Sequence, residues 1–319
     1  MFFPVSGVEV SPLVPPLVSF LISSITASSG VSGGLLILPF QVSVLNYVTP
    51  SVSSTNLIYN ISAIPGGLYR YIKEGRMVWA LTWVILVGSL PGMFAGVLVR
   101  VKYLRDPGAF KMFAGIVLLY LGIRLLVETV SRLSGRKLVK NQSPKNSAGA
   151  TTGNVRIGRK AFLPPNAVIS KSSLYLFKIE YEFLGEKYSV RTATLVGMAL
   201  VVGLFGGIYG IGGGAIIAPF CVSYLGLPIY TVAGAALAGT FLTSLAGVFF
   251  YSLHTVTAAG MQAAVAPDWA LGLLFGVGGF VGSYVGARLQ KFLPERLIRG
   301  ILGMLVTFLG LQYIIQYFL

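Results

Sequence analysis

The chain has 319 residues, of which 55% are hydrophobic and only 10% are charged, and its mean hydropathy is +0.81. A soluble globular protein carries about 25% charged residues, so the composition excludes that class and indicates a membrane protein. One cysteine, Cys221, excludes an intrachain disulfide and a multi-cysteine metal site, and the single histidine argues against a histidine-rich metal site. The formal net charge is +15, because 24 Lys and Arg residues outnumber 9 Asp and Glu residues.

Two long stretches lack Lys, Arg, Asp and Glu, one between Glu9 and Arg70 and the other between Arg191 and Asp268. A helix needs about 20 apolar residues to cross a bilayer, so each stretch has room for several spans. The first residues show no basic region followed by a cleavage site, and we expect no cleaved signal peptide. We therefore predict a multi-pass protein of the cell membrane.

Five apolar elements are expected in each half, at about 11–29, 33–47, 51–71, 77–100 and 108–130, and then at about 192–209, 213–226, 229–251, 269–290 and 296–317. The second element of each half is too short to cross, since a helix of that length extends only about 20 Å. The predicted fold is all-α, with two homologous four-span repeats (about eight transmembrane helices) that each contain a Gly-rich broken or re-entrant half-helix. The repeats occupy 1–130 and 192–319, and 131–191 links them.

The two halves match over much of their length. Gly30-Val-Ser-Gly-Gly-Leu-Leu-Ile-Leu-Pro39 aligns with Gly210-Ile-Gly-Gly-Gly-Ala-Ile-Ile-Ala-Pro219, and later Tyr71 aligns with Tyr251. Glycines 88, 92 and 96 align with glycines 278, 282 and 286, a spacing that favours close helix packing. This pattern indicates an internal duplication. Repeats with an even number of spans would be parallel, and repeats in which the short element also crosses would be inverted. We favour parallel repeats and leave inverted repeats open.

The linker 131–191 is rich in Lys and Arg. The positive-inside rule places such a segment in the cytoplasm, where we expect it to attract anionic lipid head groups. No nucleic-acid-binding motif accompanies the charge, so no nucleic-acid partner is expected. Within the linker, 141–158 has the composition of a flexible segment, and 174–190 is expected to form a short amphipathic piece at the membrane surface.

Paired Gly-rich breaks in the two halves of a membrane protein point to a transporter's binding site. Glycine permits positive φ and close approach to a ligand, and the unpaired N–H groups that open each half-helix favour an anion. Uncharged hydroxyls and amides nearby suit an anion that must also be released, although Ser, Thr and Asn also serve ordinary helix–helix hydrogen bonding. The candidate substrate-binding residues are Gly30, Ser32, Gly33, Gly34, Pro39, Thr55, Asn56, Asn60, Gly210, Gly212, Gly213, Gly214, Pro219, Thr240 and Thr243, with Ser244 close by in the same segment as the two threonines.

Charged residues within the predicted spans are few. Arg124 and Glu128 stand one helical turn apart and are expected to form a local pair, and Asp268 is expected at a membrane interface. Without a carboxylate in the bilayer, proton coupling has no evident carrier. Enzymatic patterns are also missing: the run at Gly210 lacks the Lys-Ser/Thr of a P-loop, and no Ser-His-Asp or zinc pattern occurs. We predict no enzyme, no catalytic residue, no cofactor and no metal site.

These motifs resemble the TauE/SafE sulfite-exporter-like family, which carries Gly-x-Gly-Gly-Gly-x-x-x-x-Pro in each half. The second motif, from Gly210 to Pro219, matches throughout, and the first departs only at Ser32. The resemblance implies a transporter of small sulfur-containing or organic anions, such as sulfite. We therefore expect a small anionic substrate, the lipid bilayer as surroundings, and transport by alternating access between the repeats. The alternatives are an anion channel and a non-transporting membrane scaffold, and the sequence leaves the oligomeric state undetermined.

Overall fold

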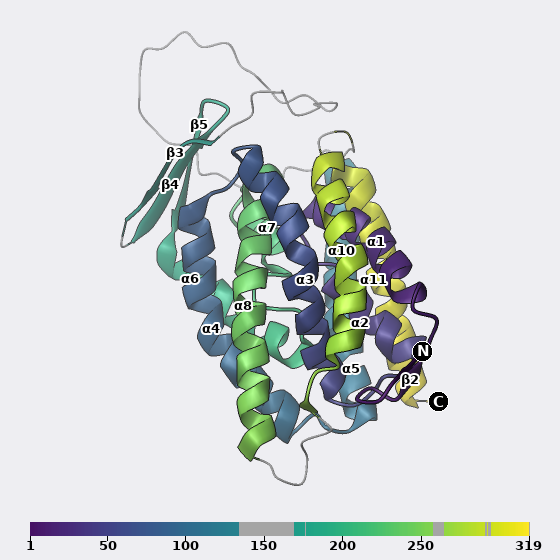
Figure 1. Ribbon diagram of the computed structural model, residues 1–319. Helices are drawn as coiled ribbons and strands as arrows, with labels where there is room; N and C mark the ends of the chain where they lie inside the picture. Colours follow the sequence, from purple (N-terminus) through teal and green to yellow (C-terminus); the bar gives the residue numbers. More distant parts are fainter. Residues whose placement is uncertain (134–168, 176, 258–264, 291, 293–294, 319) are drawn as a thin grey trace, which may run out of the picture.

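The computed structural model describes residues 1–133, 169–175, 177–257, 265–290, 292 and 295–318, and the described chain is mostly helical. The helices are α1 (Val14–Thr26), η1 (Ala27–Ser29), α2 (Gly34–Ser43), α3 (Ser51–Lys73), α4 (Trp79–Lys102), α5 (Pro107–Leu133), α6 (Thr192–Tyr209), α7 (Ile217–Tyr224), α8 (Ile229–Thr257), α10 (Trp269–Leu289) and α11 (Glu295–Phe318). The strands are β1 (Phe2–Phe3), β2 (Val8–Glu9), β3 (Ile169–Leu174), β4 (Lys178–Phe183) and β5 (Glu186–Arg191). Figure 1 shows most of the helices running roughly side by side.

Six helical segments among the described residues are long and apolar enough to cross a membrane, namely Trp79–Lys102, Pro107–Val127, Thr192–Tyr209, Ile229–Leu253, Trp269–Leu289 and Gly300–Phe318. The predicted multi-pass membrane protein is confirmed at this level. Helix α3 is also long, with 23 residues, but its Ser and Asn side chains make it less apolar. Those side chains are buried against other helices, so protein contacts compensate for polarity that lipid would penalise.

The predicted half-helices are present, and both are shorter than expected. Helix α2 has 10 residues and α7 has 8, and each contains a proline of the paired motif, Pro39 or Pro219. The Gly-rich segments before them are turns, because the chain must fold back after α1–η1 and after α6 before a new helix begins. The broken-helix prediction therefore holds for the described residues of both halves.

The two glycine triplets mediate helix packing, as predicted. Any Cβ on these glycines would press against a carbonyl oxygen of the facing helix, so only glycine lets the backbones approach this closely. In α4 the glycines face α6, and in α10 they face α1. The facing pairs are Gly88 with Val196, Gly92 with Leu200, Gly96 with Leu204, Gly278 with Pro16, Gly282 with Phe20 and Gly286 with Ser24. Residues at matching positions of the two halves thus make matching contacts.

Helices at matching positions of the two halves run in opposite directions. Near one end of the α3–α8 contact Gly234 meets Tyr71, and near the other Gly247 meets Leu57, so α3 and α8 are antiparallel. The same holds for α5 and α11, in which Gly115 meets Gly310 while Leu126 meets Gly303. The two halves are therefore inverted, and our preference for parallel repeats was wrong.

The cause of the inversion is that the α1–α2 hairpin enters and leaves at one end of the bundle. Ser6, before α1, donates to Asp268, and Ser51, at the start of α3, donates to the carbonyl oxygen of Ala266 in the same connection. The short element therefore returns the chain to its starting side. Each half then crosses an odd number of times, which inverts the second half.

Strands β3, β4 and β5 form an antiparallel sheet in that order. Alternation puts Ile179, Tyr181 and Phe183 on the buried face, and the hydroxyls of Tyr181 and Thr231 of α8 lie 2.9 Å apart. A sheet, not the expected amphipathic piece, thus occupies 174–190, because the positive φ at Leu184 (53°) and Gly185 (79°) makes a tight hairpin turn. The predicted flexible segment 141–158 lies outside the described residues.

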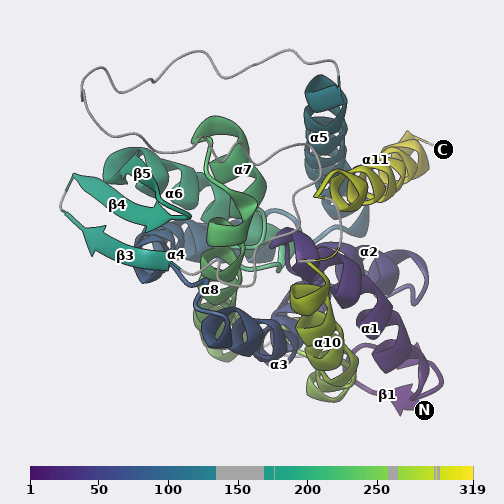
Figure 2. The same cartoon turned by 90° about the horizontal axis from the view of Figure 1, so that it is seen from above.

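Seen from above, α3 and α8 lie side by side between two other pairs of helices (Figure 2). Helices α10 and α1 stand on one side of them, and α4 and α6 on the other. Helices α5 and α11 pack on each other at the edge of the bundle. This arrangement places α3 and α8 next to both Gly-rich breaks.

Candidate functional site

Each break begins with a left-handed glycine pressed against a neighbouring helix. Gly30 has φ of +73° and Gly210 has φ of +76°. A Cβ on Gly30 would lie 2.6 Å from the Cα of Ala233 in α8, and a Cβ on Gly210 would lie 2.6 Å from the Cα of Ser53 in α3. Both the backbone conformation and the close approach require glycine here.

Asn56 of α3 joins the two breaks. Its Nδ2 donates to the carbonyl oxygens of Gly34 at 3.0 Å and of Gly210 at 2.9 Å. One turn later, the Nδ2 of Asn60 donates to the carbonyl oxygen of Ile211 at 3.0 Å, while its Oδ1 accepts a hydrogen bond from Ser32. Two segments far apart in sequence therefore meet at one face of α3.

The second break is held mainly by α8. The N–H of Gly213 donates to Thr243 Oγ1 at 2.8 Å, and Gly214 packs so closely on α8 that a Cβ would lie 2.6 Å from the amide nitrogen of Thr240. Gly212, with φ of +79°, stands beside Ser244, whose hydroxyl would lie 2.8 Å from a Cβ there. Thr243 thus holds this break by a hydrogen bond, whereas Thr240 only packs against it, because its Oγ1 donates to the carbonyl oxygen of Ala236 in its own helix.

Three of the sequence-predicted residues lie away from the junction of the breaks. Pro39 and Pro219 sit inside α2 and α7, and the carbonyl oxygen of Pro39 accepts a hydrogen bond from Tyr313. Thr55 points to the other face of α3, where its Oγ1 accepts the N–H of Asp268 at 2.8 Å. That contact fixes the start of α10.

The first N–H groups of α2 are paired, contrary to expectation. The amide of Gly34 donates to Ser32 Oγ at 3.2 Å, and the amides of Leu35, Leu36 and Ile37 donate to carbonyl oxygens of the preceding turn. Tight turns at the start of the helix use these donors. These amides are therefore not free to bind an anion. An anion beside α2 would interact with the helix dipole or with side chains, or this turn would have to rearrange.

Both breaks are enclosed by protein. Ser32 is 1% exposed, and Asn56, Asn60, Thr240 and Thr243 are each 0% exposed. Two buried polar atoms beside the breaks, Asn56 Oδ1 and Ser244 Oγ, have no hydrogen-bond partner among the described residues. Such groups are rare in folded proteins, and ordered water or an ion commonly pairs with them.

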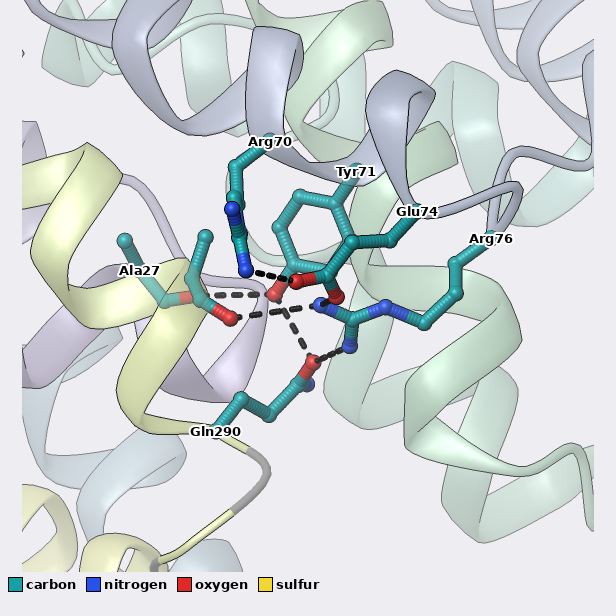
Figure 3. Close-up of polar contacts among 7 residues, drawn as sticks. Ala27, Arg70, Tyr71, Glu74, Arg76 and Gln290 are labelled. Atoms are coloured by element: carbon teal, nitrogen blue, oxygen red, sulfur yellow. Dashed lines mark hydrogen bonds and ion pairs between the residues drawn. The ribbon is translucent and has the colours of Figure 1, made fainter. Parts of the chain in front are cut away.

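A polar cluster closes the bundle over η1 at one end (Figure 3). Tyr71 donates to the carbonyl oxygen of Ala27 and to Gln290 Oε1, both at 3.1 Å. Buried Arg76 also donates to Gln290, at 2.5 Å, and pairs with Glu74, which in turn pairs with Arg70 at 2.6 Å. The cluster therefore ties the end of α3 and the α3–α4 turn to the end of α10.

At the other end, Tyr251 donates to the carbonyl oxygen of Gly207 at 2.9 Å, the matching contact of the second half. Here the buried charge is Arg100, in the last turn of α4 and 0% exposed. Arg100 is not among the candidate site residues predicted from the sequence, because it ends the apolar element 77–100 beside other basic residues. Arg100 follows Gly96 by four residues, just as Gln290 follows Gly286. This spacing puts Arg100 on the helix face of the packing glycines, and it was the sequence signal for a position inside the bundle.

The remaining charged residues singled out by the sequence are structural. The guanidinium of Arg124 lies 4.2 Å from the ring centroid of Phe220 and 4.3 Å from that of Tyr224, while the side chain of Glu128 lies outside the described residues. Asp268 is 2% exposed and caps α10, because its Oδ1 accepts the N–H of Leu271 at 3.0 Å. Among the described residues, no group of three or more His, Cys, Asp or Glu side chains is placed to hold a metal ion.

Comparison with known proteins agrees with this architecture. The profile of the sulfite exporter TauE/SafE family matches residues 16–313. The "probable membrane transporter protein YunE" of Bacillus subtilis (strain 168) is 20% identical over 302 residues, which cover 90% of this chain and 91% of that protein. No solved structure matches the chain. These names describe a membrane transporter rather than an enzyme. The chain therefore belongs to the sulfite exporter TauE/SafE family.

Proposed function

We propose that this protein transports small anions, with sulfite or a related sulfur-containing or organic anion as cargo, by alternating access. The junction at which Asn56 holds both breaks carries this proposal. Irregular backbone is tolerated at membrane depth only where protein or a polar path surrounds it. In the proposed architecture, inverted homologous repeats bring two half-helices to this junction.

The polarity around the junction favours an anion. Each described side chain that hydrogen-bonds to the breaks is an uncharged amide or hydroxyl, from Ser32, Asn56, Asn60 or Thr243. The hydroxyl of Ser244 is an unused donor beside Gly212. A cation would need carboxylates or a larger set of oxygen ligands, whereas neutral donors bind and release an anion.

The basic linker gives the proposed orientation in the cell membrane. Strands β3–β5 at the end of the linker pack at the α6 and α8 end of the bundle, so the linker marks that end. Arg70, Lys73 and Arg76 lie at the same end, close to the end of α10. We assign this end to the cytoplasm by the positive-inside rule, with anionic lipid head groups as its surface partners.

Replacement of Ser244 by Ala tests the proposal. The change removes a buried hydroxyl that has no described partner, so stability should stay the same or rise. Uptake of radiolabelled sulfite into proteoliposomes, measured under imposed pH and voltage gradients, should fall about 10-fold, the effect of losing one hydrogen bond of about 1.4 kcal/mol. Ser252→Ala is the control, because Ser252 Oγ bonds only to its own helix at Val248.

The same assay decides between the proposal and its alternatives. A transporter saturates with sulfite concentration and shows counterflow. A channel gives a current that rises linearly with voltage and does not saturate, and a scaffold gives no anion flux. If Ser244→Ala keeps full flux, the hydroxyl beside Gly212 is not part of the substrate site.

A further inference from the structure

Arg100 is a buried positive charge without a negative partner among the residues that the structure describes. It is 0% exposed, and no ion pair between it and a carboxylate exists among the described residues. Its Nη1 donates to the carbonyl oxygen of Leu104, and its guanidinium carbon lies 3.6 Å from the ring centroid of Phe110. The Nη2 has no hydrogen-bond partner in the described part of the chain. Arginine stays charged inside proteins, and an uncompensated buried charge is strongly unfavourable.

The guanidinium is one side chain away from the second break. Arg100 Nε donates to Ser53 Oγ at 3.3 Å, and Ser53 Oγ donates to the carbonyl oxygen of Ile208 at 3.3 Å. Gly210 packs directly on Ser53. One turn further along α3, Asn56 reaches the carbonyl oxygen of Gly210. A continuous polar series therefore runs from Arg100 to the junction of the two breaks.

The opposite end of the bundle lacks this feature. Gln290 occupies the position in α10 that matches Arg100 in α4, and it is neutral. The buried arginine at that end, Arg76, pairs with Glu74. Among the described residues, the α4 end therefore holds a buried arginine that forms no ion pair. Asp268, the buried carboxylate at that end, instead accepts hydrogen bonds from Ser6 and from the N–H of Leu271. The two ends thus differ in their charge even though their backbones match.

Resting on the proposed anion transport, we propose that Arg100 is the charged anion-binding residue of the pathway and that its free Nη2 binds an oxyanion oxygen on the way to the second break. The planar guanidinium matches an oxyanion with two or more oxygens, such as sulfite or a carboxylate. Anions then enter or leave past the end of α4. Arg100 sets a preference for oxyanions over a spherical halide, because a directional oxyanion oxygen matches the N–H donors of Nη2 better than a halide does.

The test measures binding apart from transport. Purified full-length protein is titrated with sodium sulfite, with chloride holding the ionic strength constant, and thermal unfolding is followed by tryptophan fluorescence. Arg100→Gln, which installs the residue of the matching position, should weaken sulfite binding about 10- to 100-fold, the effect of losing a charged hydrogen bond. Arg100→Lys keeps the charge and should bind with intermediate affinity. Lys102→Gln removes an exposed charge from the same helix end and should bind like the unmodified protein.

Sulfite uptake into proteoliposomes is measured on the same variants. Equal affinity of Arg100→Gln and unmodified protein overturns the inference, and so does an unmodified protein that sulfite, sulfate and acetate all fail to stabilise. Saturable flux that is unaffected by Arg100→Gln and Arg100→Lys leaves the proposed function in place and removes this role of Arg100. Binding that depends on Arg100 without any flux supports the site and contradicts transport. If Arg100→Gln does not fold, Arg100→Lys is compared with the unmodified protein. Equal affinities of these two proteins for sulfite and equal affinities for chloride overturn the oxyanion preference.

Discussion

Replacement of Asn56 by Ala should destabilise the protein through the backbone of both breaks. The side chain makes two hydrogen bonds, to Gly34 at 3.0 Å and to Gly210 at 2.9 Å, and it is 0% exposed. Side-chain hydrogen bonds in membrane proteins contribute about 0.6 kcal/mol on average, and a buried carbonyl that loses its donor costs about 1–3 kcal/mol. Two such losses lower the free energy of unfolding by about 1–6 kcal/mol.

The assay uses the single cysteine. Cys221 lies in α7 and is 0% exposed, so a thiol-reactive dye labels it only after the second half-helix opens. Unfolding is titrated with SDS, and the labelled fraction gives the free energy. Ser62→Ala is the matched control, because Ser62 Oγ bonds only to Ile58 of its own helix, at 3.0 Å. A loss for Asn56→Ala within about 0.5 kcal/mol of the control, the range of an unimportant substitution, refutes the claim that Asn56 holds the breaks together.

Two further substitutions test the breaks and the end cluster. Gly210→Ala should prevent folding or lower the free energy of unfolding by more than about 3 kcal/mol. The control is Gly226→Ala, because Gly226 also has a positive φ (+66°) but no atom within 4 Å of its Cβ position; this change should cost only about 1–2 kcal/mol. Equal losses for the two variants in the SDS titration would exclude close approach as the cause. Glu74→Gln should destabilise by up to about 3 kcal/mol because it leaves buried Arg76 uncompensated. Addition of Arg76→Gln should recover part of that loss, and simple additivity in the double-mutant cycle would contradict the coupling.

Much of the fold follows from sequence pattern because lipid imposes simple rules on a chain. Uncharged apolar stretches predict the spans, and the two Gly-Pro motifs predict the half-helices. The glycine triplets predict packing, since spacing of four residues places small residues on one helix face. The direction of the repeats did not follow, because it depends on whether α2 and α7 carry the chain back, and helix length alone does not reveal that return.

The sequence predicted which residues line the candidate site better than it predicted the hydrogen bonds and charges found there. The sequence identified Asn56 and Asn60 because a buried amide in a span needs a partner, and the structure supplies those partners on both breaks. Ser32 pairs the first amide of α2, which the glycine motif alone did not indicate. Arg100 was missed because it lies in the last turn of α4, at the start of a run of basic residues, and only the tertiary contacts show that this side chain turns inward while Lys102 stays exposed.

The packing divides the inner helices into two units, which are the candidate moving bodies of the proposed transport cycle. Helix α10 of the second half packs on α1 and α3 of the first, and α4 of the first half packs on α6 and α8 of the second. The sequence halves are therefore interlocked, and the natural units are α1–α2–α3–α10 and α6–α7–α8–α4, which meet where α3 contacts α8. Asn56 spans this seam: its bond to Gly34 stays within one unit, whereas its bond to Gly210 crosses to the other. In the proposed cycle, separation of the units breaks the bond from Asn56 to Gly210 together with the bonds from Asn60 to Ile211 and from Arg100 to Ser53, while the bond from Asn56 to Gly34 remains.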